Sequence, residues 1–568
     1  MILCLLSVVS CDDFLKETPY GQITTEITFS RSSDLEGAVH VLYRRIGRAM
    51  YDLNQFIQSQ MGDDLSTNTY SSHGAIREWD AMGVSATNDR SLIGWENKYM
   101  VIKAANFIIN GVEKTPGVTK ADIEYALGQA YFWRAWAYFY LVRTYGPLPK
   151  IVSLQVDVPV GLSTVAEIYK FIVEDLKKAE DLLLANYTGV PRTMNGVNVV
   201  ASKGAVQAVL SCVYMTMAGW PLEYGADYYN LAAAEALKVI EGANSGVYYY
   251  KLYDEFRLIH SKQENFKNTE AICAAYFSLA LGEGSESDAA RSCISDIPIT
   301  NGGWEDTNAE IGFWYYFPAG PRKLATYPEW IFFHNFTTGA EGFCRWWDER
   351  TSMFSRQPYF GKSGFTVAGS TAEYDFKQFV MPQADYWSDQ THQMVRLSEV
   401  YLFYAESVGR AGKVNQTAID LLNTVRNRAD GFGAVADRSK APVPDRPHVE
   451  KYVNEYPDNL TPEQLAEAAY NEHGWEIAGW YRGAITPRVN DQQRMKRLQD
   501  AFELRQTNPS YTFEDPDNPG TFVTVQQWRY YTQQVWSDTR MFAPYPYDEI
   551  RVNPLLDITP EQKLTMIK

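Results

Sequence analysis

The chain has 568 residues, of which 45% are hydrophobic and 21% are charged, a balance typical of globular proteins that bury a core. Its 52 Lys and Arg residues against 69 Asp and Glu residues give a net charge of -17 at pH 7. This charge argues against a nucleic-acid partner and against attachment to an anionic membrane surface by charge. Beyond the leader, no run of about 18 apolar residues predicts a membrane-spanning helix.

The first fifteen residues are typical of a secretory leader. The apolar run Ile2–Val9 is too short to span a bilayer, and no Lys or Arg precedes it, so the natural start is expected further upstream. Val8-Val9-Ser10-Cys11 resembles a bacterial lipobox, in which the cysteine becomes the first mature residue and carries acyl chains. An ordinary signal peptide is the alternative. We expect removal of residues 1–10, lipidation at Cys11 and a spacer over 11–33.

Residues 34–243 show apolar side chains at helical spacing. The longest helix is predicted over 121–145, where aromatic residues interleave with alanines, which favours packing against neighbouring helices over a binding stripe. Thr164-x-x-Glu167 has the spacing of a capping box and predicts the start of the next helix. Further helices are expected over 202–218 and 228–243.

Two stretches lack helical periodicity. Residues 60–88 are polar and predict a loop. In 244–390, glycines, prolines and clustered aromatics become frequent, which predicts a loop-rich, aromatic-rich insertion with short strands such as 271–277. We expect this insertion to carry the ligand-binding surface.

Helical patterns resume in the C-terminal part, residues 391–568. Helices are predicted over 394–412 and 417–430, the second capped by Thr417, and another begins at Thr461-Pro462-Glu463-Gln464. The fold class is therefore predicted to be mainly α, a tetratricopeptide-like stack of helical hairpins with one loop-rich insertion.

Motifs for catalysis are absent from the sequence. The seven histidines show no metal-ligand spacing, and no nucleophile elbow, Walker loop or dinucleotide fingerprint occurs. His473 shares a predicted helix face with apolar residues and is interpreted as a core histidine instead of a ligand. Asp515–Gly520 fails as a calcium loop and predicts a solvated turn. We expect no metal, no cofactor and no enzyme, although 69 carboxylates leave a hydrolytic pair open.

The cysteines after the leader are Cys212, Cys273, Cys293 and Cys344. None forms a C-x-x-C pair, so neither a zinc site nor a thioredoxin-like redox site is indicated. One disulfide among the last three and buried free thiols are both open alternatives.

Binding of a sugar requires an aromatic platform for its apolar C–H face and polar side chains for its hydroxyls. Two polar loops and one downstream pair supply this mixture. The first loop offers Asp63, Asp64, Asn68, Tyr70, Arg77 and Trp79. The second offers Asn301, Trp304 and Asp306, followed by Trp314, Tyr315 and Tyr316, and the downstream pair is Arg345 and Trp346. Exposed Trp304 and Trp79 on one concave surface would favour a glycan binder, whereas an extended groove with unpaired strand edges would favour a peptide- or protein-binding scaffold.

Three segments resemble the SusD/RagB family of outer-membrane nutrient-binding lipoproteins. They are Ser10–Leu15 with Pro19, the pattern over Arg396–Ala429, and Pro544–Leu555, of which the second is the most specific. The resemblance spans essentially the whole chain. It weakens over Glu472–Arg488, where a difference on the ligand side or the partner side is left open.

The resemblance implies a function. It implies that the protein is a lipid-anchored helical body on the cell surface, above a SusC-like TonB-dependent transporter. Such a protein binds an oligosaccharide, or in some family members a peptide, before import. The resemblance also implies that Asp12 and Asp13 act as the surface-export signal, that only the lipid contacts the membrane, and that ligand sites lie on loops of the two regions named above.

Overall fold

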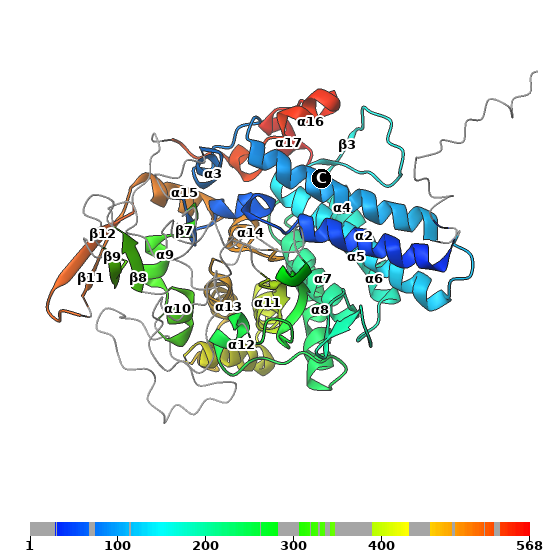
Figure 1. Cartoon of the computed structure of the whole chain (residues 1–568). Coiled ribbons are helices and arrows are strands. Elements are labelled where there is room, and N and C mark those ends of the chain that lie inside the picture. The colour runs from blue at the N-terminus through cyan, green and yellow to red at the C-terminus, as the bar shows by residue number, and fades with distance from the viewer. Residues whose placement is uncertain are drawn as a thin grey trace, which may run out of the picture.

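The computed structural model describes residues 29, 31–67, 74–112, 115–261, 263–281, 306–318, 320–327, 330–334, 341–346, 389–430, 455–479, 483–515, 517–527 and 534–568. The leader, Cys11, Asp12 and Asp13 lie outside these ranges. Helices dominate the described part (Figure 1). None of the helices in these ranges is long and apolar enough to cross a membrane.

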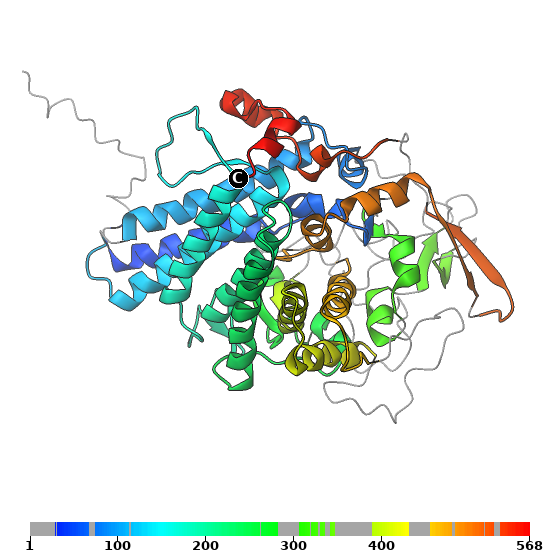
Figure 2. The same ribbon diagram turned by 180° about the vertical axis from the view of Figure 1, so that it is seen from behind.

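A stack of antiparallel helices forms one half of the molecule, as Figures 1 and 2 show. Consecutive helices pack against each other, α4 on α5, α5 on α6 and α7 on α8. The mainly α, tetratricopeptide-like prediction is confirmed. The helices are α2 (Ser32–Arg48), α4 (Asp89–Gly111), α5 (Lys120–Tyr145), α6 (Val165–Leu182), α7 (Lys203–Ala218) and α8 (Ala226–Asn244).

Local sequence signals set the ends of these helices. Thr164 accepts a hydrogen bond from the backbone of Glu167 and the Glu167 side chain returns one, so the predicted capping box of α6 is confirmed. The aromatic face of α5 is core, as predicted, because Trp133 and Tyr138 are almost fully buried between neighbouring helices.

The stack continues through α11 (Leu397–Arg410), α12 (Gln416–Ala429) and α13 (Pro462–Ile477), with α11 packed on α8 and on α13. Thr461 and Gln464 form the predicted capping box of α13. Two predictions are wrong here. The cap of α12 is Asn415, not Thr417, since its side chain accepts from the backbone of Ala418. Residues His392–Arg396 form strand β10, which pairs antiparallel with β6 (Ala271–Ala275).

Short elements gather on the side of the molecule opposite α2 and α4 to α8 (Figure 1). As predicted for the insertion, strands are short and pair only two by two in the described ranges. The insertion also contains two short helices, α9 (Ile311–Tyr316) and α10 (Pro321–Thr326). The strand pairs are β1 (Leu65–Ser66) with β7 (Asn308–Ala309), β8 (Trp330–His334) with β9 (Glu341–Arg345), and β11 (Ser510–Glu514) with β12 (Phe522–Gln526).

The predicted loop over 60–88 is partly wrong, because it contains α3 (Gly74–Asp80), preceded by the 3-10 segment η2 (Leu53–Met61). The predicted turn after Asp515 is confirmed. It joins β11 to β12, and the Asp515 carboxylate accepts from the backbone of Asp517. The remaining elements are short and complete the described part of the chain. They are α14 (Arg488–Arg494), α15 (Leu498–Gln506), α16 (Tyr547–Val552), α17 (Pro560–Thr565), β2 (Leu148–Pro149), β3 (Leu162–Ser163), β4 (Thr193–Met194) and β5 (Val197–Asn198), with 3-10 segments η4 (Phe256–His260), η5 (Leu279–Leu281), η10 (Asp538–Met541) and η11 (Pro554–Leu556).

Two of the four cysteines can be assigned. Cys212 and Cys273 are buried free thiols, and Cys273 Sγ lies 3.6 Å from Met394 Sδ. Of the alternatives, a free thiol is therefore the state of Cys273. Cys293 and the side chain of Cys344 lie outside the described part of the chain.

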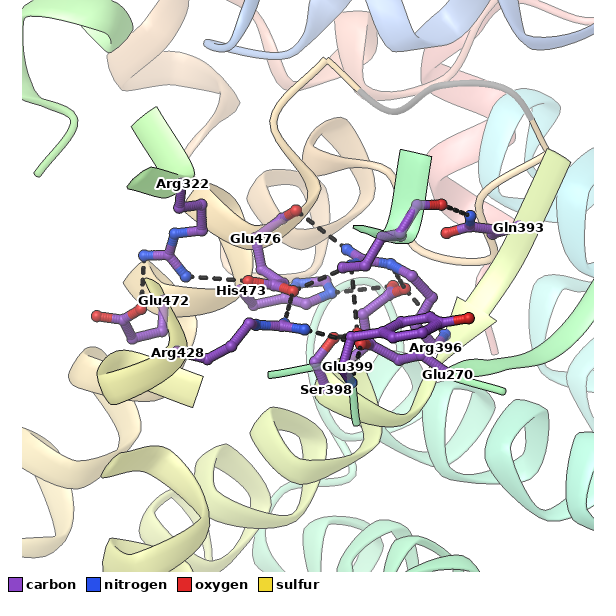
Figure 3. A network of polar contacts seen from close by, with 12 residues as sticks. Glu270, Arg322, Gln393, Arg396, Ser398, Glu399, Arg428, Glu472, His473 and Glu476 are labelled. Atoms are coloured by element: carbon purple, nitrogen blue, oxygen red, sulfur yellow. Dashed lines mark hydrogen bonds and ion pairs between the residues drawn. The ribbon is translucent and has the colours of Figure 1, made fainter. Parts of the chain in front are cut away.

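Charged side chains join the insertion to the C-terminal helices in the interior (Figure 3). Glu476 of α13 accepts hydrogen bonds from Arg322 and Arg396 at 3.0 Å each, and from Arg428. All side chains of this buried charge network are at most 2% exposed. It comprises Glu270, Arg322, Arg396, Arg428, Glu472 and Glu476.

The network resolves the alternative left open for the helix at Glu472–Arg488. Glu472 and Glu476 point into the protein and pair with arginines, so these two residues serve the fold and not a ligand surface. His473 is 1% exposed, and its Nδ1 lies 2.5 Å from Asp491 Oδ2. The prediction that it is a core histidine is confirmed.

Candidate ligand-binding site

Strands β1 and β7 bring the two predicted binding loops side by side. Leu65 pairs with Ala309 and Ser66 with Asn308. Gln60 Nε2 donates to Thr307 Oγ1 at 2.8 Å, and the backbone N–H of Glu310 donates to Asp64 O at 3.1 Å. The first loop and the start of the second therefore meet at a junction whose paired strand residues are buried.

Gln527, directly after β12, holds three segments together at this junction. Its Oε1 accepts from the N–H of Ile311 at 2.7 Å, its Nε2 donates to Ser66 Oγ at 2.9 Å, and its own N–H donates to Pro509 O at 3.0 Å. This one amide fixes α9 and the β11–β12 hairpin relative to β1.

Arg505 of α15 also stabilises the first loop at this junction. It is 3% exposed, and its guanidinium donates to Met61 O at 3.1 Å, Asp80 O at 2.9 Å and Leu65 O at 3.0 Å. Sequence reasoning did not identify Arg505. Its acceptors are backbone carbonyls of residues distant in sequence, and every residue type carries such a carbonyl.

The paired aspartates of the first loop are structural. Asp63 accepts from Arg488 Nε at 2.8 Å and Nη2 at 3.2 Å, and Asp64 accepts from the N–H of Gly479 at 2.8 Å. Burial, with a smaller contribution from the Asp63 charge, raises the pKa of Asp64 to about 7. The expectation that Asp64 offers a carboxylate to a ligand is corrected, since its side chain is buried and already bonded.

Most predicted aromatic platforms are also inside the protein. Trp79 is 1% exposed, Trp314 2% and Trp346 0%. The Trp314 ring meets Trp346 edge-on at 5.0 Å and contacts Phe513 of β11 at 5.1 Å. The expectation of exposed rings at these positions is wrong, because the hairpin packs over Trp314 and Trp346. Asp306 is buried as well, and Arg77 is half-buried.

Tyr316 does remain exposed, in a group of three tyrosines in which Tyr315 is half-buried and Tyr511 is buried. We call this group the aromatic ledge. Tyr316 is 57% exposed. The three rings contact one another, with ring centroids 5.0 Å apart for Tyr315 and Tyr316, 5.3 Å for Tyr315 and Tyr511, and 6.3 Å for Tyr316 and Tyr511. Such edge-on and tilted contacts hold the three rings in fixed orientations.

The ledge is positioned by close packing between α9 and β11. A Cβ on Gly312 would clash with the Tyr511 hydroxyl, so glycine is required there. The Tyr315 hydroxyl donates to Thr512 O at 3.3 Å. No sequence pattern singled out Tyr511, although the alternation in Ser510–Glu514 is typical of a strand with one buried face.

Other predicted site residues cannot be placed. Asn68, Tyr70, Asn301 and Trp304 lie outside the described residues. The backbone of Arg345 belongs to β9, and its side chain is outside the description. These five assignments remain predictions.

Comparison with known proteins assigns the chain to a family. A family model described as "Starch-binding associating with outer membrane" matches residues 13–215, and the SusD family model matches residues 358–561. A SusD-like protein of Bacteroides ovatus is 25% identical, covering 98% of this chain and 96% of that protein. SusD-like protein P2 of Formosa agariphila is 26% identical over 38% of this chain and 42% of its own length.

Solved structures agree in fold. A SusD homolog from Bacteroides thetaiotaomicron superposes with a TM-score of 0.72 at 17% identity, covering 94% of this chain and 98% of that one. A second structure, solved with a xylogluco-oligosaccharide, has a TM-score of 0.65 at 20% identity, covering 93% and 98%. The two family matches, over residues 13–215 and 358–561, show that the chain belongs to the SusD/RagB family, whose members are binding proteins.

Proposed function

We propose that the protein is a cell-surface lipoprotein that captures an oligosaccharide and delivers it to a SusC-like TonB-dependent transporter. The observation that carries this proposal is the aromatic ledge, where Tyr316 presents a largely exposed ring at the end of α9, the helix that follows β7 in the second polar loop. A sugar stacks its C–H face on such a ring, and neighbouring polar groups bond its hydroxyls. A structural relative solved with a xylogluco-oligosaccharide supports this class of ligand.

Screening of the purified protein against arrays of oligosaccharides and of peptides tests the ligand class. We expect saturable binding to at least one glycan family, and recovery of the bound glycan uncleaved, because the protein acts by binding alone. Binding confined to peptides would favour the alternative of a peptide-capturing lid, and cleavage of the glycan would contradict the non-enzymatic role.

Anchoring is proposed to depend on Cys11, with Asp12 and Asp13 directing the protein to the outer face. Cys11→Ala should move the protein from the membrane fraction to the soluble fraction. Asp12→Asn with Asp13→Asn should retain membrane attachment but lose accessibility to protease added to whole cells. Persistent co-sedimentation of Cys11→Ala would contradict the lipid anchor.

A further inference from the structure

A cavity of about 400 Å³ lies between α3 and the C-terminal segment 537–563. Trp79 and Met82 line it from one side, and Arg540, Tyr545 and Lys563 line it from the other. Figures 1 and 2 place α3 near α16 and α17, on the same side of the molecule. The volume is in the range of pockets that bind small molecules, about 300 to 1,000 Å³.

Lys563 contributes a buried cation to this cavity. It is 2% exposed, and its ammonium donates to Tyr145 O at 3.1 Å and Ala543 O at 2.6 Å, above the Tyr545 ring at 3.4 Å. No carboxylate pairs with it in the part of the chain that the structure describes, where both of its acceptors are backbone carbonyls. Burial lowers the pKa of Lys563 well below its usual value. A buried ammonium without a counter-ion is costly, and an anion beside it would relieve that cost.

Two residues that line the cavity each carry a buried donor without a partner. Trp79 Nε1 and Arg540 Nε are buried atoms with no hydrogen-bond acceptor among the described residues, although Arg540 Nη1 donates to Met82 O at 2.7 Å. A buried donor that is left unpaired destabilises the fold, and an acceptor that reaches it relieves this cost. Asp557 also lines the cavity, but it is exposed to solvent.

We propose that this cavity is a second ligand site, separate from the aromatic ledge, that binds a small organic carboxylate. A carboxylate is purely an acceptor with about four lone-pair positions, so it matches a set of N–H donors that includes two cations. Met82, Phe542 and Ile550 give the cavity apolar walls that would enclose the body of the ligand. The site is distinct from the glycan proposal, since none of the three ledge tyrosines lines the cavity.

Titration calorimetry with matched pairs of probes tests the site. Glucuronate is compared with glucose, and benzoate with benzyl alcohol, so that each pair differs at the carboxylate. We expect at least one acid to bind the wild-type protein saturably with one site, and at least tenfold more tightly than its neutral match. Binding of neither acid, or equal binding of the neutral match, would overturn the proposal.

Variants locate the binding. Arg540→Gln and Trp79→Phe, which each remove one unpaired donor, should weaken the acid at least fivefold. Arg551→Gln removes the same charge from an exposed position near the C-terminus and should leave affinity unchanged, as should Tyr316→Ala on the ledge. Wild-type affinity in both Arg540→Gln and Trp79→Phe, or a loss in Tyr316→Ala, would overturn the assignment.

Discussion

The buried charge network and the aromatic ledge differ in what surrounds them. Side chains of the network are at most 2% exposed and pair with one another across α10, α12, α13 and the strand pair β6–β10. Tyr316 on the ledge is instead 57% exposed, and its ring contacts two other tyrosines. Loss of one charge in the interior leaves opposite charges unpaired, so the network is sensitive to every substitution. An exposed ring can be substituted without disturbing the fold, so the residues of the ledge can vary to suit a ligand.

Glu476→Gln should give the largest loss of stability. Glu476 accepts from three arginines, and removal of its charge leaves these cations buried and under-paired. We expect a fall of about 3–5 kcal/mol in the free energy of unfolding, measured by chemical denaturation. Asp548→Asn, which breaks the exposed ion pair with Arg551, is the control and should change stability little. Equal effects of the two variants would contradict the distinction between interior and surface charges.

The free energy of unfolding should also depend on pH, because of the buried His473. Burial alone would lower the pKa of His473, but the carboxylates of Asp491 and Glu399 raise it from 6.5 to about 9. The protonated ring therefore stabilises the fold fully below pH 6.5, and this contribution is lost as the pH rises through 9. The expected loss is about 3 kcal/mol, measured as the unfolding free energy at pH 6 and pH 9.5. The His473→Gln variant should not show this loss of stability between pH 6 and pH 9.5. The same loss in the variant as in the wild type would contradict the role of His473.

Substitution of Asp64, in the first loop of the candidate site, should have the opposite effect on stability. Because burial raises the pKa of Asp64 from 3.8 to about 7, folding opposes its ionisation, and the cost grows from pH 3.8 until it is complete above pH 7. Asp64→Asn should therefore stabilise the protein, by about 2 kcal/mol more at pH 8 than at pH 5.5. Asp63→Asn, which breaks the pair with Arg488, should destabilise it instead. A gain for Asp64→Asn that does not depend on pH would count against the raised pKa.

Much of the fold could be predicted from the sequence, because its signals are local. The capping boxes at Thr164 and Thr461 mark the starts of α6 and α13, and the aromatic helix α5 has its predicted span to within one residue. Strand β10 was missed, since its pairing with β6 depends on a segment more than a hundred residues earlier in the chain.

The site was less predictable for a related reason. Residue type indicated which loops carry aromatic and polar groups, and β1 and β7 do bring the described parts of these loops together. Exposure, however, is decided by what packs on top. Phe513 from a later hairpin contacts Trp314, while Tyr511 from the same strand supports the exposed Tyr316. Neither relation can be deduced from the two loops alone.

The most direct test of the account is a calorimetric titration of the best-binding glycan from the array against Tyr316→Ala and Tyr547→Ala. The two tyrosines are similarly exposed, at 57% and 53%, but Tyr547 lies on α16, away from the ledge. Loss of one stacking platform should weaken binding about tenfold in Tyr316→Ala and leave unfolding unchanged, with wild-type affinity in Tyr547→Ala. Unchanged affinity in Tyr316→Ala, or an equal loss in both variants, would contradict the ledge as the glycan site.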